Sequence, residues 1–201
     1  MLSNIPNILT IIRILLTPVF AYFFISTASN SSIYAALFFF MAAATDWYDG
    51  YLARRINHTT RLGQFLDPIA DKVLVLTAMA MFAIKNYVYW WMIIIIIIRD
   101  VLITSLRLYA LQHGKSIITS SFAKWKTFIQ MGFIFAVIIY INIPGAPDIH
   151  LSYTRSDWVL WTTISAIIVV LLTFASGIHY LYFNRSHLIE IFKRLTQRWF
   201  S

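Results

Sequence analysis

Four aspartates lie in apolar stretches of a 201-residue chain that has only eight acidic residues. They are Asp46, Asp49, Asp67 and Asp71. A carboxylate inside a membrane costs about 2.5–3.5 kcal/mol even on the more lenient insertion scale, so four of them need compensating positive charge. Two divalent cations would supply that charge. The residues therefore predict metal-assisted chemistry on a phosphate substrate at a membrane.

The spacing of the aspartates indicates how helices would position them. Asp46 and Asp49 are three residues apart, and Asp67 and Asp71 are four apart, so each pair shares one helix face. With a rise of ~1.5 Å per residue, both pairs lie roughly 14–19 Å along their helices from a turn near residue 58. We expect two antiparallel helices to gather the four carboxylates on the cytoplasmic side. Oxygen ligands, without cysteine or suitably spaced histidine, favour two Mg²⁺ or Mn²⁺ ions.

The composition indicates an integral membrane protein. The chain is 60% hydrophobic with a mean hydropathy of +0.73, which is far above soluble averages. Its length allows about six spans of ~20 residues and little else. We therefore expect an all-α fold, in which residues 1–201 form a single membrane domain with six transmembrane helices. Their expected ranges are about Ile8–Ser26, Ile33–Ile56, Leu62–Ile84, Trp91–Gln112, Ser121–Ile141 and Trp158–Tyr182.

The distribution of the +8 net charge predicts the orientation. Lysine and arginine gather in alternate loops and in the tail, which places those loops, both termini and the aspartates on the cytoplasmic side. In the tail, apolar residues recur at helical spacing among cations, which predicts an amphipathic helix on the inner surface at about 185–200. The cation excess is explained by orientation and by attraction to anionic lipid. We therefore expect membrane lipids, and no nucleic acid, as partners.

From residue 46 to 71 the chain reads D-x2-D-G-x2-A-R-x8-G-x3-D-x3-D, and this pattern resembles the signature of the CDP-alcohol phosphatidyltransferases at every position. The resemblance implies that the four aspartates hold two divalent metals on the diphosphate of a CDP-linked lipid. It implies that Asp71 is also the general base, and that the enzyme is a homodimer. The residues that would line the CDP-lipid pocket are Gly50, Ala53, Arg54 and Gly63.

Two further stretches resemble the bacterial phosphatidylglycerophosphate synthases within that family. They are NIPNILTIIR at 4–13 and KWKTFIQ at 124–130. Ala123 departs from an expected glycine, and Asp100 stands where glutamate is commoner. The resemblance implies phosphatidyl transfer from CDP-diacylglycerol to glycerol 3-phosphate, with release of CMP, in the bacterial inner membrane.

An acceptor that carries its own phosphate needs a cationic pocket beside the metals. The candidates are Arg99, Arg107, Lys124 and Lys126. Lys124 and Lys126 point to different helix faces, so we expect one of them to face the site. For Arg99 an alternative is an intramembrane pair with Asp100.

Several alternatives stay open. The same chemistry could use phosphatidylglycerol, serine or inositol phosphate as the acceptor. A divalent-cation transporter would explain the acids, but not the glycines, alanine and arginine at fixed offsets. A membrane prenyltransferase also uses aspartates and magnesium, although its motifs usually lie far apart in a longer chain. In a scaffold protein the acids would instead pair with Arg54, Arg55, Arg61 and Lys72.

Overall fold

The computed structural model describes residues 5–56, 61–112, 121–146, 149–151 and 160–185. At residues 5–7, 49–56, 61–68, 71, 111–112 and 121–124 it describes the backbone alone. The described part of the chain forms six helices and contains no strand. These helices are α1 (Ile5–Ile25), α2 (Ser31–Ile56), α3 (Arg61–Ile84), α4 (Trp90–Gln112), α5 (Ser121–Tyr140) and α6 (Trp161–Phe183).

The expected all-α fold is confirmed for these residues, and each helix end lies within three residues of its expected position. Runs of about 20 apolar residues make such helices because a backbone without water must satisfy its own hydrogen bonds. Two segments, Ile8–Ile25 and Trp161–Phe183, are long and apolar enough to cross a membrane by length and composition. The expected surface helix at about 185–200 lies outside the described residues, apart from Arg185.

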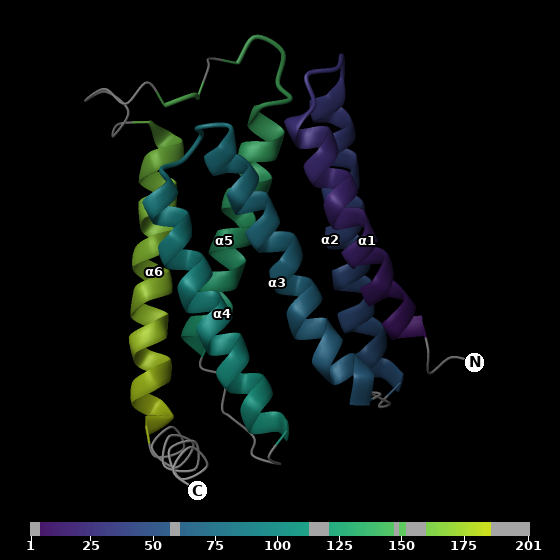
Figure 1. The fold of residues 1–201 in the computed structure, drawn as a ribbon, viewed down its shortest axis with the longest axis vertical. Coiled ribbons are helices and arrows are strands. Elements are labelled where there is room, and N and C mark those ends of the chain that lie inside the picture. Colours follow the sequence, from purple (N-terminus) through teal and green to yellow (C-terminus); the bar gives the residue numbers. More distant parts are fainter. Residues whose placement is uncertain (1–4, 57–60, 113–120, 147–148, 152–159, 186–201) are drawn as a thin grey trace, which may run out of the picture.

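Successive helices run in opposite directions (Figure 1). The start of α1, the end of α2, the start of α3, the end of α4, the start of α5 and the end of α6 therefore lie at the same end of the bundle. The main packed pairs are α1 with α2, α1 with α3, α3 with α4, α3 with α5, α4 with α6 and α5 with α6. Since α1 packs on both α2 and α3, it can place side chains against the two helices that carry the four aspartates.

The buried face of α1 changes character along the helix. Thr10, Arg13 and Thr17 are buried along its N-terminal and middle turns, and Phe20 and Phe24 continue the same face toward its C-terminal end. A helix repeats its faces every three to four residues, so one stripe serves both regions. The polar part lies toward the end of the bundle where α1 begins (Figure 1).

Aromatic rings join the helices in the apolar half of the bundle. The Phe20 ring on α1 lies 5.3 Å from the Phe39 ring on α2, and Phe24 lies 5.6 Å from Phe82 on α3. Phe82 in turn meets Phe133 on α5 at 6.1 Å in an edge-on arrangement, a geometry that aromatic pairs prefer. This packing fixes how α1, α2, α3 and α5 sit relative to one another, and so fixes the level of the charged residues on them.

The turn between α3 and α4 ends α3 in a well-defined way. Asn86 takes a left-handed conformation with φ 56°, which asparagine tolerates better than most residues. The amide of Tyr87 donates to the carbonyl of Phe82 at 2.8 Å, and the amide of Asn86 donates to that of Ala83 at 3.0 Å. These two bonds form a Schellman motif, which ends α3 and redirects the chain into α4.

Candidate active site

The signature aspartates lie on two helices that run in opposite directions. Asp46 and Asp49 are in the second half of α2, and Asp67 and Asp71 are in the first half of α3. The end of α2 and the start of α3 lie at the same end of the bundle (Figure 1). Of these four side chains, only that of Asp46 is described. The described residues hold no group of three or more potential metal ligands, so the two-metal cluster stays a prediction.

A buried arginine on α1 contacts the first of these aspartates. The Nη1 atom of Arg13 lies 2.7 Å from Oδ1 of Asp46, with the arginine side chain 1% exposed and the aspartate 40% exposed. Arg13 reaches this position because α1 packs along α2 and because it falls on the buried stripe of α1. Arg13 contacts one oxygen of the Asp46 carboxylate. A carboxylate has about four acceptor sites, so the partly exposed side chain of Asp46 can accept a further ligand.

The backbone positions expected to line the CDP-lipid pocket also lie near the α2–α3 connection. Gly50, Ala53 and Arg54 are in the last two turns of α2, and Gly63 is in the first turn of α3. Their side-chain surroundings lie outside the described residues. Their assignment to the CDP-lipid therefore stays a prediction.

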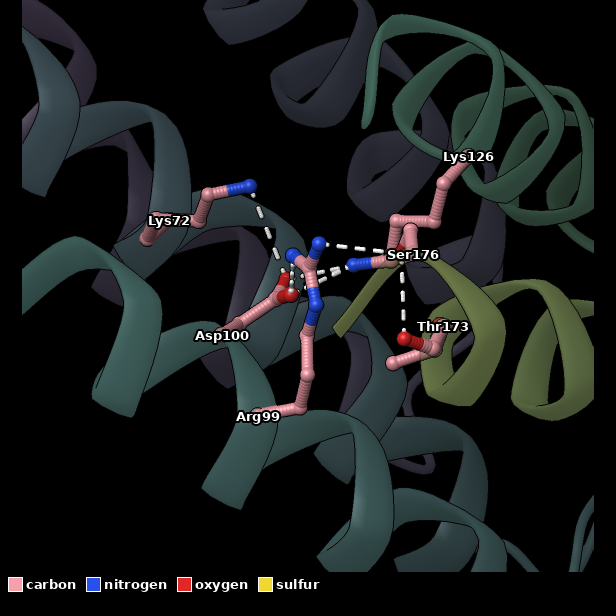
Figure 2. Close-up of polar contacts among 6 residues, drawn as sticks. All are labelled: Lys72, Arg99, Asp100, Lys126, Thr173 and Ser176. Atoms are coloured by element: carbon pink, nitrogen blue, oxygen red, sulfur yellow. Dashed lines mark hydrogen bonds and ion pairs between the residues drawn. The ribbon is translucent and has the colours of Figure 1, made fainter. Parts of the chain in front are cut away.

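A second charged group lies deeper among α3, α4, α5 and α6, around Asp100 (Figure 2). We call it the Asp100 cluster. It consists of Lys72, Arg99, Asp100, Lys126 and Ser176. The carboxylate of Asp100 is fully buried, with its side chain 0% exposed.

The cations of the Asp100 cluster approach its carboxylate from three helices. Lys126 on α5 donates from Nζ to both carboxylate oxygens, at 2.6 and 2.7 Å. Arg99 on α4 donates from Nη1 to Oδ1 at 2.9 Å. Lys72 on α3 completes the group, with Nζ 3.5 Å from Oδ2. Bonds between ionised groups are shorter and stronger than neutral ones, so the carboxylate fixes these side chains firmly.

Helix α6 holds the other end of the Arg99 guanidinium. The Nη2 atom of Arg99 donates to Oγ of Ser176 at 2.9 Å, and Ser176 in turn donates to the carbonyl of Thr173 at 3.0 Å (Figure 2). Gly177 makes room for the arginine, because a Cβ atom at that position would lie 3.3 Å from Cγ of Arg99. The guanidinium is therefore held from both α4 and α6.

The structure distributes the four expected phosphate ligands unevenly. Arg99 and Lys126 lie together in the Asp100 cluster. Arg107 is exposed on α4, and the side chain of Lys124 lies outside the described residues. The contact between Arg99 and Asp100 that the sequence left as an alternative is present, yet Arg99 keeps a buried Nε atom without a hydrogen-bond partner.

Three charged residues near these groups were absent from the expected site. They are Arg13, Lys72 and Asp100. Each is an ionisable residue within a helix of mostly apolar composition, and such a residue is a functional candidate by default. That signal was present in the sequence, which offered Asp100 as an alternative partner of Arg99 but did not identify the partner of Arg13.

Comparison with known proteins yields consistent matches. Residues 3–175 match the family model described as CDP-alcohol phosphatidyltransferase. A protein of Blochmanniella floridana is 38% identical over 93% of this chain and 94% of its own length. A protein of Wigglesworthia glossinidia brevipalpis is 42% identical over 67% of this chain and 76% of its own length.

A protein of Escherichia coli (strain K12) is 44% identical over 64% of this chain and 72% of its own length. All three relatives bear the name CDP-diacylglycerol–glycerol-3-phosphate 3-phosphatidyltransferase.

Proposed function

The chain belongs to the CDP-alcohol phosphatidyltransferase family, and from this membership we propose how its own residues carry out the reaction. It is a phosphatidyltransferase that moves the phosphatidyl group from CDP-diacylglycerol to glycerol 3-phosphate, giving phosphatidylglycerophosphate and CMP. In this reaction the acceptor hydroxyl attacks the phosphorus that bears the diacylglycerol, and CMP leaves with the electrons of the broken P–O bond.

The family generally depends on divalent metal ions, and the residues of this chain suit that need. Asp46, Asp49, Asp67 and Asp71 offer only carboxylate oxygens, which are the ligands that Mg²⁺ and Mn²⁺ prefer. Asp46 remains 40% exposed while Arg13 holds one of its oxygens. We assign the two metals to these four residues. When bound, the metals neutralise the diphosphate and stabilise the leaving phosphate.

Asp71 is our candidate for the general base. It would accept the proton of the acceptor hydroxyl as the new P–O bond forms, because a carboxylate beside the reacting atoms can do so. Gly50, Ala53 and Gly63 would allow the cytidine and diphosphate close to the helix backbone, and Arg54 offers a planar donor pair suited to phosphate. The CDP-lipid would thus lie over the end of α2 and the start of α3.

The Asp100 cluster is our candidate for the acceptor's phosphate site, and its charge carries this assignment. Three cations, Lys72, Arg99 and Lys126, surround the carboxylate of Asp100, and Arg99 keeps a buried Nε donor without a hydrogen-bond partner. Arg99 and Lys126 are largely buried and share this one carboxylate, and such a site favours an anionic ligand because an incompletely compensated buried cation is costly. The phosphate of glycerol 3-phosphate carries close to two negative charges near neutral pH. Arg107 and Lys124 would guide the acceptor nearer the surface.

The protein is associated with the membrane, and we propose six spans with both termini and the site on the cytoplasmic side of a bacterial inner membrane. Two observations support this orientation. The start of α1, the end of α2 and the end of α6 share one end of the bundle (Figure 1), and the sequence places most of its lysines and arginines in the connections and tail next to these helix ends. The C-terminal stretch at about 185–200 would lie on the inner surface, and the enzyme would act as a homodimer.

A direct test is CMP release from labelled CDP-diacylglycerol by the purified protein, with an acceptor panel of glycerol 3-phosphate, serine, inositol phosphate and phosphatidylglycerol. We expect release to require glycerol 3-phosphate together with Mg²⁺ or Mn²⁺. Equal or faster release with another alcohol would contradict the acceptor assignment. Metal flux into sealed vesicles without nucleotide would instead support a transporter.

Asp71→Asn separates the base from the binding site. This variant should retain CDP-diacylglycerol binding and lose turnover, because the amide cannot accept the proton. Asp71→Asn with normal turnover would remove Asp71 from the role of base. Lys85→Gln, at the opposite end of the bundle, serves as the matched control with a lost charge.

A further inference from the structure

The carboxylate at the centre of the Asp100 cluster has no place in the chemistry described so far. It is too buried to meet the CDP-lipid, and its oxygens are taken up by cations. We propose that Asp100 is a positioning residue, which holds Lys126 and Arg99 in the arrangement that binds the acceptor's phosphate. This inference rests on the proposed acceptor site, and it concerns the affinity for glycerol 3-phosphate rather than the bond-making step.

The hydrogen bonds around Asp100 leave donors available for a ligand. The two oxygens of Asp100 occupy two of the three N–H groups of Lys126. Arg99 gives Nη1 to Asp100 and Nη2 to Ser176, while its Nε atom is buried without a partner. The carboxylate therefore orients both cations without using up their donors.

A neighbouring amide also lacks a partner. Gln130 lies one helical turn beyond Lys126 on the same face of α5, and it is 1% exposed. Neither its Nε2 nor its Oε1 atom has a hydrogen-bond partner. Buried polar groups are nearly always satisfied, so this amide indicates a ligand or water beside Lys126. An acceptor with hydroxyl groups and a phosphate offers both a donor and acceptors there.

Two opposite roles for Asp100 are conceivable, and burial decides between them. If Asp100 only competed with phosphate for the cations, then its removal would free them and strengthen binding. However, Lys126 is 1% exposed, so without Asp100 its ammonium would lose its counterion and face Lys72 and Arg99 in a low-dielectric site. Such a cation loses its proton or moves toward water. We therefore infer that loss of Asp100 weakens phosphate binding.

The test measures steady-state CMP release by the full-length protein in mixed micelles, with each substrate varied in turn. Asp100→Asn keeps the size and removes the charge. It should raise the KM for glycerol 3-phosphate by about tenfold or more, as expected when a buried charge pair loses one partner. The KM for CDP-diacylglycerol should change by less than about twofold, because that substrate lies over other residues. Asp100→Glu should recover most of the lost affinity.

A merely structural role would give a different pattern. It would lower kcat and the stability of the protein and affect both KM values alike, and Asp100→Glu would not restore the acceptor's KM selectively. That pattern would overturn the proposal, as would a lower KM for glycerol 3-phosphate in Asp100→Asn. If Asp100→Asn does not fold, Asp100→Glu decides. Its added methylene shifts the carboxylate, so its acceptor KM should still rise by about threefold while its KM for CDP-diacylglycerol changes less, and an equal rise in both KM values refutes the proposal.

The control variant is Lys85→Gln, whose charge lies at the opposite end of the bundle. Failure of the proposed function would look different from failure of this inference. In the first case the wild-type protein would release no CMP with glycerol 3-phosphate. If only this inference fails, the wild-type protein would be active, and Asp100→Asn would have the same KM for glycerol 3-phosphate as the wild-type protein.

Discussion

Replacement of Arg13 by methionine tests whether the buried pair on α1 and α2 serves the metal site. The variant keeps an unbranched side chain of similar length on the buried stripe of α1 and removes the charge. Asp46 then loses its 2.7 Å contact with Nη1. We expect the carboxylate to lose its fixed orientation, and therefore to bind metal less well, because the outer partner of a metal ligand sets its direction.

The magnitude follows from the geometry of the pair. Two unit charges 2.7 Å apart attract by about 6 kcal/mol at an effective dielectric constant of 20. Asp46 is 40% exposed, so water screens the pair, and a charged hydrogen bond of about 1.5–3 kcal/mol is the better measure. That free energy corresponds to a loss of metal affinity of roughly 10–100-fold, the range seen for outer partners of metal ligands.

The assay is the Mn²⁺ concentration that gives half-maximal CMP release, together with the dissociation constant for Mn²⁺ measured by electron paramagnetic resonance. Arg13→Met should raise both, and Arg13→Lys should lie between it and the wild-type protein, because it keeps the charge and loses the planar donor pair. Lys85→Met is the control for loss of a cation elsewhere. If folded Arg13→Met binds Mn²⁺ as the wild-type protein does, then Arg13 does not orient a metal ligand. Tighter binding would mean that Arg13 competes with the metal.

Three further outcomes follow from the packing and the ligand set. Gly177→Ala should lower the stability in detergent by about 1 kcal/mol, because the new Cβ atom would lie 3.3 Å from Cγ of Arg99; thermal unfolding checks this. Phe20→Ala should lower stability by about 3 kcal/mol, because the ring is fully buried against Phe24 and Phe39. The exposed Phe174 provides the matched control, since Phe174→Ala should change stability by less than about 0.5 kcal/mol. Chelation with EDTA should abolish CMP release, and added Mg²⁺ or Mn²⁺ should restore it; turnover that persists in EDTA would exclude the metal assignment.

The helices could be predicted from the sequence because their signal is local. An apolar run of about 20 residues specifies a helix regardless of its neighbours, so each of the six helix positions was foreseen. Which helices pack against one another could not be predicted in the same way. The sequence argument treated the helices that carry the aspartates as direct neighbours, whereas α1 packs along both of them. That contact depends on the fit of Phe20 and Phe24 against distant rings, which no local pattern encodes.

The candidate site shows the same division between local and distant information. The spacing of Lys124 and Lys126 predicts that they point to different faces of one helix; the structure buries Lys126, and the side chain of Lys124 lies outside the described residues. The partner of that lysine, Asp100, lies 26 positions earlier in the chain, and Asp100 also pairs with Lys72, a further 28 positions earlier. A sequence can identify such residues as costly in a membrane, but their pairing depends on the three-dimensional packing.

The two charged groups together explain how one site could hold two anionic substrates. Carboxylates on α2 and α3 would hold metals against the diphosphate of the CDP-lipid, while Arg99 and Lys126 of the Asp100 cluster would bind the acceptor's phosphate. Lys72 follows Asp71 directly in α3, so the same helix serves both groups. Without such a division, two phosphate groups brought close enough to react would repel each other by several kcal/mol at an effective dielectric constant of about 20. The placement of opposite charge beside each substrate removes that repulsion before the reaction begins, which is what a preorganised active site requires.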